Sequence, residues 1–136
     1  DVRIVKNYTD SALSVLADPA LLRQAFFNLC INAIDSMPKG GELTLNIYSG
    51  QSAMKNKEVI IEIADTGKGI SKDILPRIFE PFFTTKEPGK GTGLGLSIVH
   101  LILERHKGSI AVESVVDKGT KFTIRLSSES DLTTSN

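Results

Sequence analysis

The residues with the clearest chemical potential lie in the segment 65–97. Asp65 ends an apolar run, where a carboxylate is costly unless it accepts hydrogen bonds, and the exocyclic amine of adenine is a suitable donor. Gly67 and Gly69 follow it, and residues without side chains let a flat ring lie against the backbone. An ordinary Asp-Thr-Gly turn explains the same residues. The motif alone leaves both interpretations open.

Three alternating glycines, Gly91, Gly93 and Gly95, stand directly before an apolar helical pattern. Successive N–H groups in such a segment can converge on an anion at the helix N-terminus. The spacing differs from the Walker loop and from the dinucleotide fingerprint. A flexible hinge is the alternative, and the polar segment 84–90 has the composition of a lid. The two interpretations agree if the far end of a lid binds phosphate.

Asn28 and Asn32 lie four residues apart in a predicted helix, between two apolar stripes. Mg²⁺ prefers oxygen ligands and keeps several waters, so one amide oxygen with phosphate oxygens would suffice to hold it. Buried amides need partners, and hydrogen bonds to loop backbone would also satisfy them. The helix alone favours this second, simpler interpretation.

Phe79, Phe82 and Phe83 lie beside the lid segment, where they either anchor the lid on the core or form a docking surface. Lys86 and Lys90 can neutralise phosphate charge, although lysines in polar loops are usually solvated.

Composition excludes several classes of protein. The 136 residues fit one domain, and 16 basic residues balance 16 acidic ones, so we expect no nucleic-acid or direct membrane contact. The single cysteine, Cys30, suits a reducing cytoplasmic location and is better explained as apolar filler than as a catalytic thiol. The chain shows no signal peptide or transmembrane run, and its start at Asp1 suggests a piece of a parent that can itself be membrane-anchored.

Hydrophobic periodicity predicts an α+β fold, a two-layer sandwich with a mixed five-stranded sheet and about three helices on one face. The apolar stripes of the longest helix, one containing Leu22 and Leu29 and the other Phe27, Ile31 and Ile34, are both expected to be buried. We expect a domain over 1–126 and a polar, disordered tail over 127–136. The expected strands are 2–6, 42–49, 58–64, 109–116 and 119–126. The expected helices are 19–36, a short one over 71–78 whose regularity Pro76 limits, and 97–106, which continues a helix begun at the glycines.

Four segments resemble, in order and spacing, the N, G1, F and G2 boxes of sensor histidine kinases: 28–33, 65–70, 79–83 and 91–96. Gly119 and Thr120 resemble the later Gly-Thr element. The resemblance covers nearly the whole chain and implies the catalytic and ATP-binding domain, with the Bergerat (GHKL) fold shared with gyrase and mismatch-repair ATPases.

The resemblance implies a site for ATP and Mg²⁺. Asn32 would be the Mg²⁺ ligand with Asn28 beside it, Asp65 would read the adenine amine, and Thr120 would assist through water. Lys86, in a variant resembling nitrogen-regulatory-type kinases, would reach the γ-phosphate and, with the two asparagines, serve catalysis. The other implied contacts to the nucleotide are Asp35, Gly67, Gly69, Ile70, Phe79, Thr85, Gly91, Thr92, Gly93, Leu94, Gly95 and Leu96.

Departures from the family pattern refine the expectation. GHKL ATPases carry a water-activating glutamate where this chain has Asn28, which argues for phosphoryl transfer to a protein rather than hydrolysis. Asp35 stands where many sensor kinases have a basic residue. The phosphoacceptor histidine and its helical hairpin are missing, and His100 and His106 lack the context of an acceptor, so both are expected to be structural.

The resemblance therefore implies transfer of the γ-phosphoryl group to a histidine on a separate dimerisation domain, with a response regulator downstream. Alternatives are a GHKL ATPase, an anti-sigma-type serine kinase or a non-catalytic nucleotide-sensing module.

Overall fold

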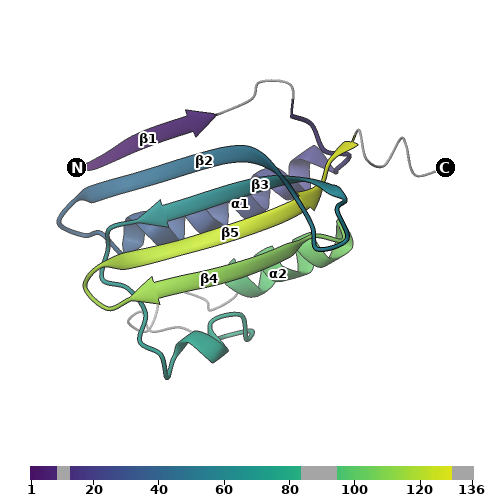
Figure 1. Ribbon diagram of the computed structural model, residues 1–136. Coiled ribbons are helices and arrows are strands. Elements are labelled where there is room, and N and C mark those ends of the chain that lie inside the picture. Colours follow the sequence, from purple (N-terminus) through teal and green to yellow (C-terminus); the bar gives the residue numbers. More distant parts are fainter. Residues whose placement is uncertain (9–12, 84–94, 130–136) are drawn as a thin grey trace.

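The computed structural model describes residues 1–8, 13–83 and 95–129. These residues form one five-stranded sheet with the helices packed on a single face (Figure 1). The strand order is β1-β2-β3-β5-β4; β1 pairs with β2 in parallel and the other pairs are antiparallel. The predicted mixed sheet and α+β class are confirmed. The strands are β1 (Val2–Tyr8), β2 (Gly41–Gln51), β3 (Lys57–Asp65), β4 (Ser109–Val115) and β5 (Gly119–Ser127).

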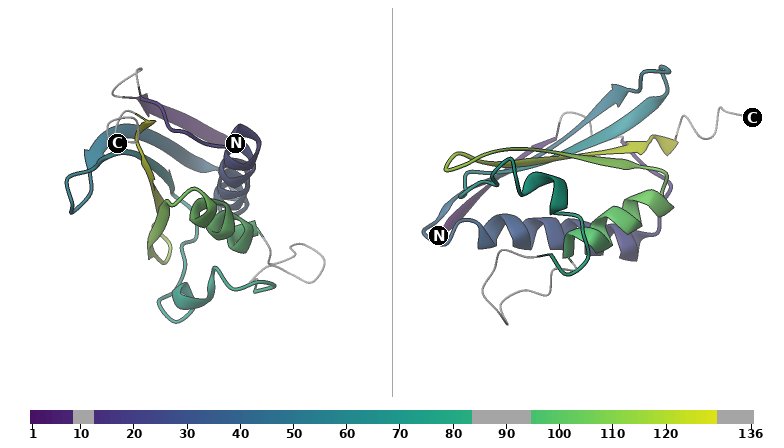
Figure 2. Two further views of the ribbon diagram at one scale, coloured as in Figure 1. Left: turned by 90° about the vertical axis from the view of Figure 1, so that its right-hand side faces the viewer. Right: turned by 90° about the horizontal axis from the view of Figure 1, so that it is seen from below.

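The helical layer consists of α1 (Pro19–Asp35), α2 (Gly95–Arg105) and the short 3-10 turn η1 (Leu75–Arg77), as Figure 2 shows from two further sides. Helix α1 begins where the sequence predicts, because the Asp18 carboxylate accepts hydrogen bonds from the N–H groups of Ala20 and Leu21, at 3.0 and 3.3 Å. Where 71–78 was predicted to be helical, only η1 forms, since Pro76 cannot donate a backbone hydrogen bond.

The imidazole of His106 holds the start of α1, which confirms the structural role expected for this residue. Its Nε2 accepts from the Asp18 N–H at 3.0 Å, while Nδ1 lies 2.8 Å from the Ile102 carbonyl oxygen. Because Nε2 accepts, the proton of the neutral ring must be on Nδ1.

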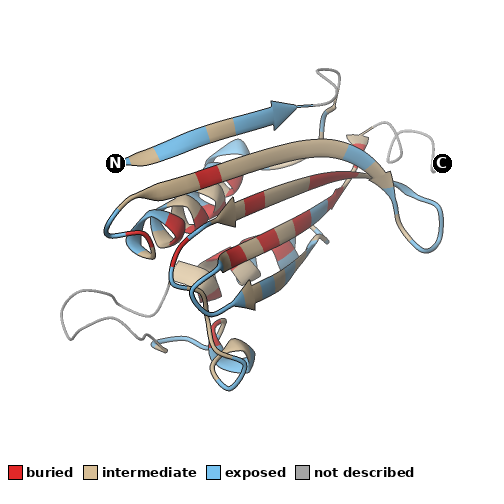
Figure 3. Ribbon diagram, turned by 60° about the vertical axis from the view of Figure 1, so that its left-hand side comes forward, coloured by how far each residue is buried: buried red, intermediate tan, exposed pale blue. Residues whose placement is uncertain are grey.

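The core lies between the sheet and the helices. Leu29 of α1, Val99 of α2 and Ile124 of β5 have no exposed surface, and Figure 3 shows that buried positions recur along the helices and the strands β2, β3 and β5. Full burial of such side chains stabilises the fold by about 1.5–3 kcal/mol each.

The prediction that both apolar stripes of α1 are buried is wrong. Phe27, Ile31 and Ile34 are 65%, 40% and 39% exposed, whereas Leu22 and Leu29 pack in the core. A two-layer fold covers a helix on one side only, so the second stripe remains on the outer surface.

At the C-terminal end, ordered contacts continue beyond the predicted boundary at residue 126. Strand β5 includes Ser127, the Ser128 N–H donates to the Lys57 carbonyl at 3.0 Å, and the Glu129 N–H donates to the Ser14 carbonyl at 2.9 Å. The rest of the predicted tail, 130–136, lies outside the described residues. Within the described part of the chain, no helix combines the length and the apolar character that spanning a membrane requires.

A polar network on the open face of the sheet joins neighbouring strands through Glu62. Its Oε1 accepts from Asn46 Nδ2 at 3.0 Å, its Oε2 accepts from Tyr48 Oη at 2.8 Å, and Lys121 Nζ lies 3.8 Å from Oε2. The hydrogen bond from Asn46 is the main cause that lowers the pKa of Glu62, and the bond to Glu62 raises the pKa of Tyr48. The charged carboxylate therefore stabilises the sheet.

We expect Glu62→Gln to lower the free energy of unfolding at pH 7 by about 1 kcal/mol. Because folding lowers the pKa of Glu62, its contribution is complete above the unfolded value and is lost as pH falls below about 4. Denaturant titrations from pH 7 to pH 3 should show the difference from the unmodified chain shrinking with acid. Glu113→Gln, at an exposed glutamate of β4, is the control. A difference independent of pH would contradict the assignment.

Candidate nucleotide-binding site

Asp65 ends β3 at the edge of the helical layer and is held by two backbone groups. Its Oδ1 accepts from the Gly67 N–H at 2.8 Å and from the Thr120 N–H at 3.3 Å. Thr120 lies directly opposite it on β5. Within the described part of the chain both hydrogen bonds end on Oδ1, so Oδ2 is the oxygen that remains for a ligand.

Packing within the domain is enough to explain why glycine occupies positions 67 and 69. A Cβ atom at Gly67 would collide with the side chain and carbonyl of Ser36, and one at Gly69, where φ is +73°, would collide with the Val115 carbonyl. The turn thus fits between the end of α1 and the β4–β5 hairpin, where the Lys68 N–H donates to the Ser36 carbonyl at 3.1 Å. The turn interpretation holds, and base contact at these glycines stays a prediction.

Asn28 and Asn32 both lie on α1, which extends from this turn back toward the start of α2. Asn28 Nδ2 donates a long hydrogen bond, 3.5 Å, to the Gly95 carbonyl. The half-buried side chain of Asn32 makes no hydrogen bond to another described residue, so its amide oxygen is open to a ligand. Residues 28–35 span about 10 Å of helix, and Asp35 ends α1 beside the glycine turn. Cys30 is half-buried, and burial raises the pKa of its thiol, as expected of apolar filler.

The three phenylalanines of the F-box segment have different surroundings. The Phe79 ring lies 5.6 Å from the ring of His100 and 6.4 Å, edge-on, from that of Phe122. The Arg77 guanidinium lies 4.5 Å from the centre of the Phe83 ring. Phe82 is 73% exposed, and its φ is +67°. Phe79 therefore anchors this segment on the core, while Phe82 does not.

Part of the predicted site lies outside the described residues: Thr85, Lys86, Lys90, Gly91, Thr92, Gly93 and Leu94. Gly95 and Leu96 begin α2, and a Cβ at Gly95 would meet no atom within 4 Å. Unlike Gly67 and Gly69, Gly95 has no packing reason in the described structure, which leaves its backbone open to close approach. Ile70 lies beside the turn, where its N–H donates to Ser114 Oγ at 2.7 Å.

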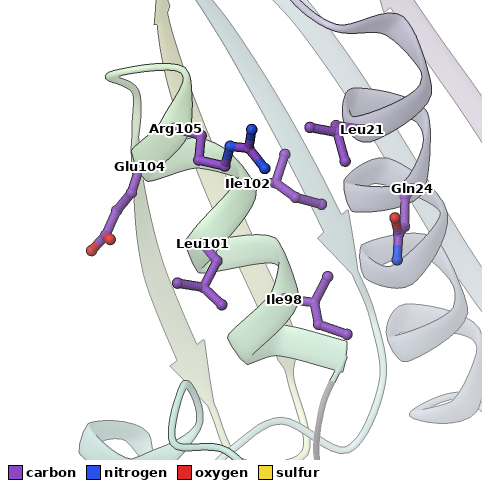
Figure 4. Close-up of a pocket in the computed structure, with 7 residues that line it drawn as sticks. All are labelled: Leu21, Gln24, Ile98, Leu101, Ile102, Glu104 and Arg105. Atoms are coloured by element: carbon purple, nitrogen blue, oxygen red, sulfur yellow. The ribbon is translucent and has the colours of Figure 1, made fainter.

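A groove of about 480 Å³ lies elsewhere, between the N-terminal half of α1 and residues 98–105 of α2 (Figure 4). It contains none of the predicted ligand residues and is therefore distinct from the site at Asp65. Its lining residues are Leu21, Gln24, Ile98, Leu101, Ile102, Glu104 and Arg105. Among the residues that the structure describes, no group of three His, Cys, Asp or Glu side chains could hold a metal ion.

Sequence reasoning missed Ser114 of β4. Its Oγ lies 2.8 Å from Thr120 Oγ1 and 3.0 Å from the Gly119 carbonyl oxygen. Only the register of the predicted hairpin, in which Ser114 pairs with Thr120, could have indicated that these two residues are neighbours. No local motif marks it.

Comparisons with known proteins identify the family and the fold of the chain. The family model described as histidine kinase-, DNA gyrase B-, and HSP90-like ATPase matches residues 17–130. The chain is 43% identical over 136 residues to the sensor kinase CckA of Brucella abortus (strain 2308), with 93% of the chain covered but only 14% of that relative. It thus spans a small part of the curated protein that it matches.

Solved structures of sensor kinases share the fold. The mycobacterial sensor histidine kinase MprB superposes with a TM-score of 0.79 at 27% identity, covering 93% of this chain and 82% of that one. Full-length ShkA, solved in complex with AMPPNP, superposes with a TM-score of 0.77 at 30% identity, covering 93% of this chain and 26% of that one. The chain belongs to the histidine kinase-, DNA gyrase B- and HSP90-like ATPase family, as a catalytic and ATP-binding domain of the sensor histidine kinase type.

Proposed function

We propose that this domain binds Mg²⁺-ATP and, in its parent protein, transfers the γ-phosphoryl group to a histidine on a separate dimerisation domain. A response regulator would then receive the phosphoryl group. The reaction would take place in the cytoplasm, where ATP and response regulators are found.

The observation that carries the proposal is the geometry of Asp65 beside α1. A carboxylate fixed through Oδ1 leaves Oδ2 for an amine such as that of adenine, and the helix with Asn32 leads from there to the start of α2. Adenine at one end, phosphates near Gly95 and Mg²⁺ at Asn32 fit this order. AMPPNP in the related ShkA complex supports a nucleotide as the ligand.

The chemistry favours transfer over hydrolysis. Phosphoryl transfer needs positioning and charge neutralisation more than covalent chemistry from the protein. Asn28, an amide, cannot accept a proton from water as a general base. The proposed roles of Lys86 and of the glycines 91 and 93 would supply phosphate contacts from the lid segment.

Supplying the dimerisation domain of the parent, together with this domain, with γ-labelled Mg²⁺-ATP tests the proposal. We expect label on a histidine of the dimerisation domain and little free phosphate from the catalytic domain alone. Rapid release of free phosphate from the catalytic domain alone would support an ATPase instead. ATP binding without label on histidine would support a nucleotide-sensing module.

A further inference from the structure

We propose that Ser114 is a positioning residue that sets the base selectivity of the site by fixing the proton of the Thr120 hydroxyl. The assignment rests on the proposed binding of ATP. Ser114 lies on the edge strand β4, and its Oγ contacts three groups from two other segments: the Ile70 N–H at 2.7 Å, the Gly119 carbonyl oxygen at 3.0 Å and Thr120 Oγ1 at 2.8 Å.

The donors and acceptors around Ser114 leave one consistent arrangement. The Ile70 N–H only donates, so it occupies one lone pair of Ser114 Oγ. The Gly119 carbonyl only accepts, so it takes the single Ser114 proton. The bond between the two hydroxyls must then run from Thr120 to the remaining lone pair of Ser114. Thr120 Oγ1 therefore has only lone pairs left for a ligand group that contacts it directly.

This arrangement makes the base end of the site an acceptor surface. Asp65 Oδ2 accepts as a carboxylate oxygen, and Thr120 Oγ1 accepts because its proton is used, while the Thr120 N–H is bound to Asp65 Oδ1. Two acceptors suit an exocyclic amine, which carries two hydrogens. A base with a carbonyl oxygen at the same position would face acceptors and bind poorly. Thr120 is only 6% exposed, so water does not readily compensate for a mismatch.

The test compares ATP with inosine triphosphate, in which a carbonyl oxygen replaces the amine, by calorimetry with Mg²⁺. Ser114→Thr and Ser114→Val have the same shape, but only the first keeps the hydroxyl. We expect Ser114→Thr to retain the wild-type preference for ATP. In Ser114→Val the freed Thr120 hydroxyl can donate to the carbonyl, so the preference should fall about three- to tenfold.

A second measurement separates positioning from stability. In a Thr120→Val background, Ser114→Val should produce no further change in the preference, since its effect passes through the Thr120 hydroxyl. Ser109→Ala, at the exposed start of the same strand, is the control for β4. Equal weakening of both nucleotides by Ser114→Val, or equal preferences in the Thr and Val variants, would overturn the assignment while leaving ATP binding in place. Absence of ATP binding by the wild-type domain would overturn the proposed function as well.

Discussion

Asp65→Asn is expected to weaken ATP binding by about 100-fold while the domain remains folded. The two backbone N–H groups at Oδ1 require an oxygen there, so the substituted amide would turn its oxygen toward Gly67 and Thr120. Its NH2 group would then take the place of Oδ2 and face the adenine amine, donor against donor. Losing a charged hydrogen bond and creating this mismatch costs about 3 kcal/mol. Calorimetric titration with Mg²⁺-ATP measures the change.

Asp117→Asn is the matched control for this substitution. Asp117 is exposed in the neighbouring β4–β5 turn, and its φ of +65° lies in a region that asparagine tolerates well. Its N–H, which the substitution leaves intact, donates to the Lys68 carbonyl at 2.8 Å. We expect ATP affinity within about twofold of the wild type. Unchanged affinity in Asp65→Asn would reject Asp65 as the base-reading residue.

The strands and the start of α1 could be predicted because local signals decide them. Alternation of apolar residues in 43–47 and 122–126 marks inward-facing strand positions, and Asp18 before Pro19 marks a helix start. The exposure of Phe27 and Ile31 could not be predicted in this way. Periodicity reports which faces of a helix are apolar, whereas the number of layers in the fold decides which of those faces is covered.

The residues of the candidate site also differ in whether a local motif marks them or only long-range contacts bring them together. Asp65 and Asn32 could be proposed from the sequence because each carries chemistry that a local motif displays, and their roles stay predictions. The packing role of Gly67 against Ser36 depends on contacts between segments 31 residues apart in sequence, and that of Ser114 depends on strand register. Long-range contacts of this kind leave no local pattern in one sequence. They emerge only when the strands and α1 are placed together.

Asn32→Ala is expected to abolish the effect of Mg²⁺ on ATP affinity and to reduce phosphoryl transfer at least 100-fold. The Asn32 side chain makes no hydrogen bond within the described residues, so its removal should leave the fold intact. An amide oxygen is a hard ligand suited to Mg²⁺, and without it the ion and the phosphates lose their fixed position. Titrations with ATP in Mg²⁺ and in EDTA should give different affinities for the wild type and equal ones for the variant.

Two further variants test whether the amide oxygen of Asn32 is the group that holds the ion. Asn32→Asp keeps an oxygen ligand and should retain the dependence on Mg²⁺, whereas Asn32→Leu has a similar size without that oxygen and should lose it. Gln24→Ala removes an exposed amide from the same helix, in the groove between α1 and α2, and should leave both affinities unchanged. If Asn32→Ala still binds ATP more tightly with Mg²⁺ than with EDTA, the ion must be held by other groups. Asn32, which is half-buried and open to a ligand, would then contact the phosphates rather than the metal.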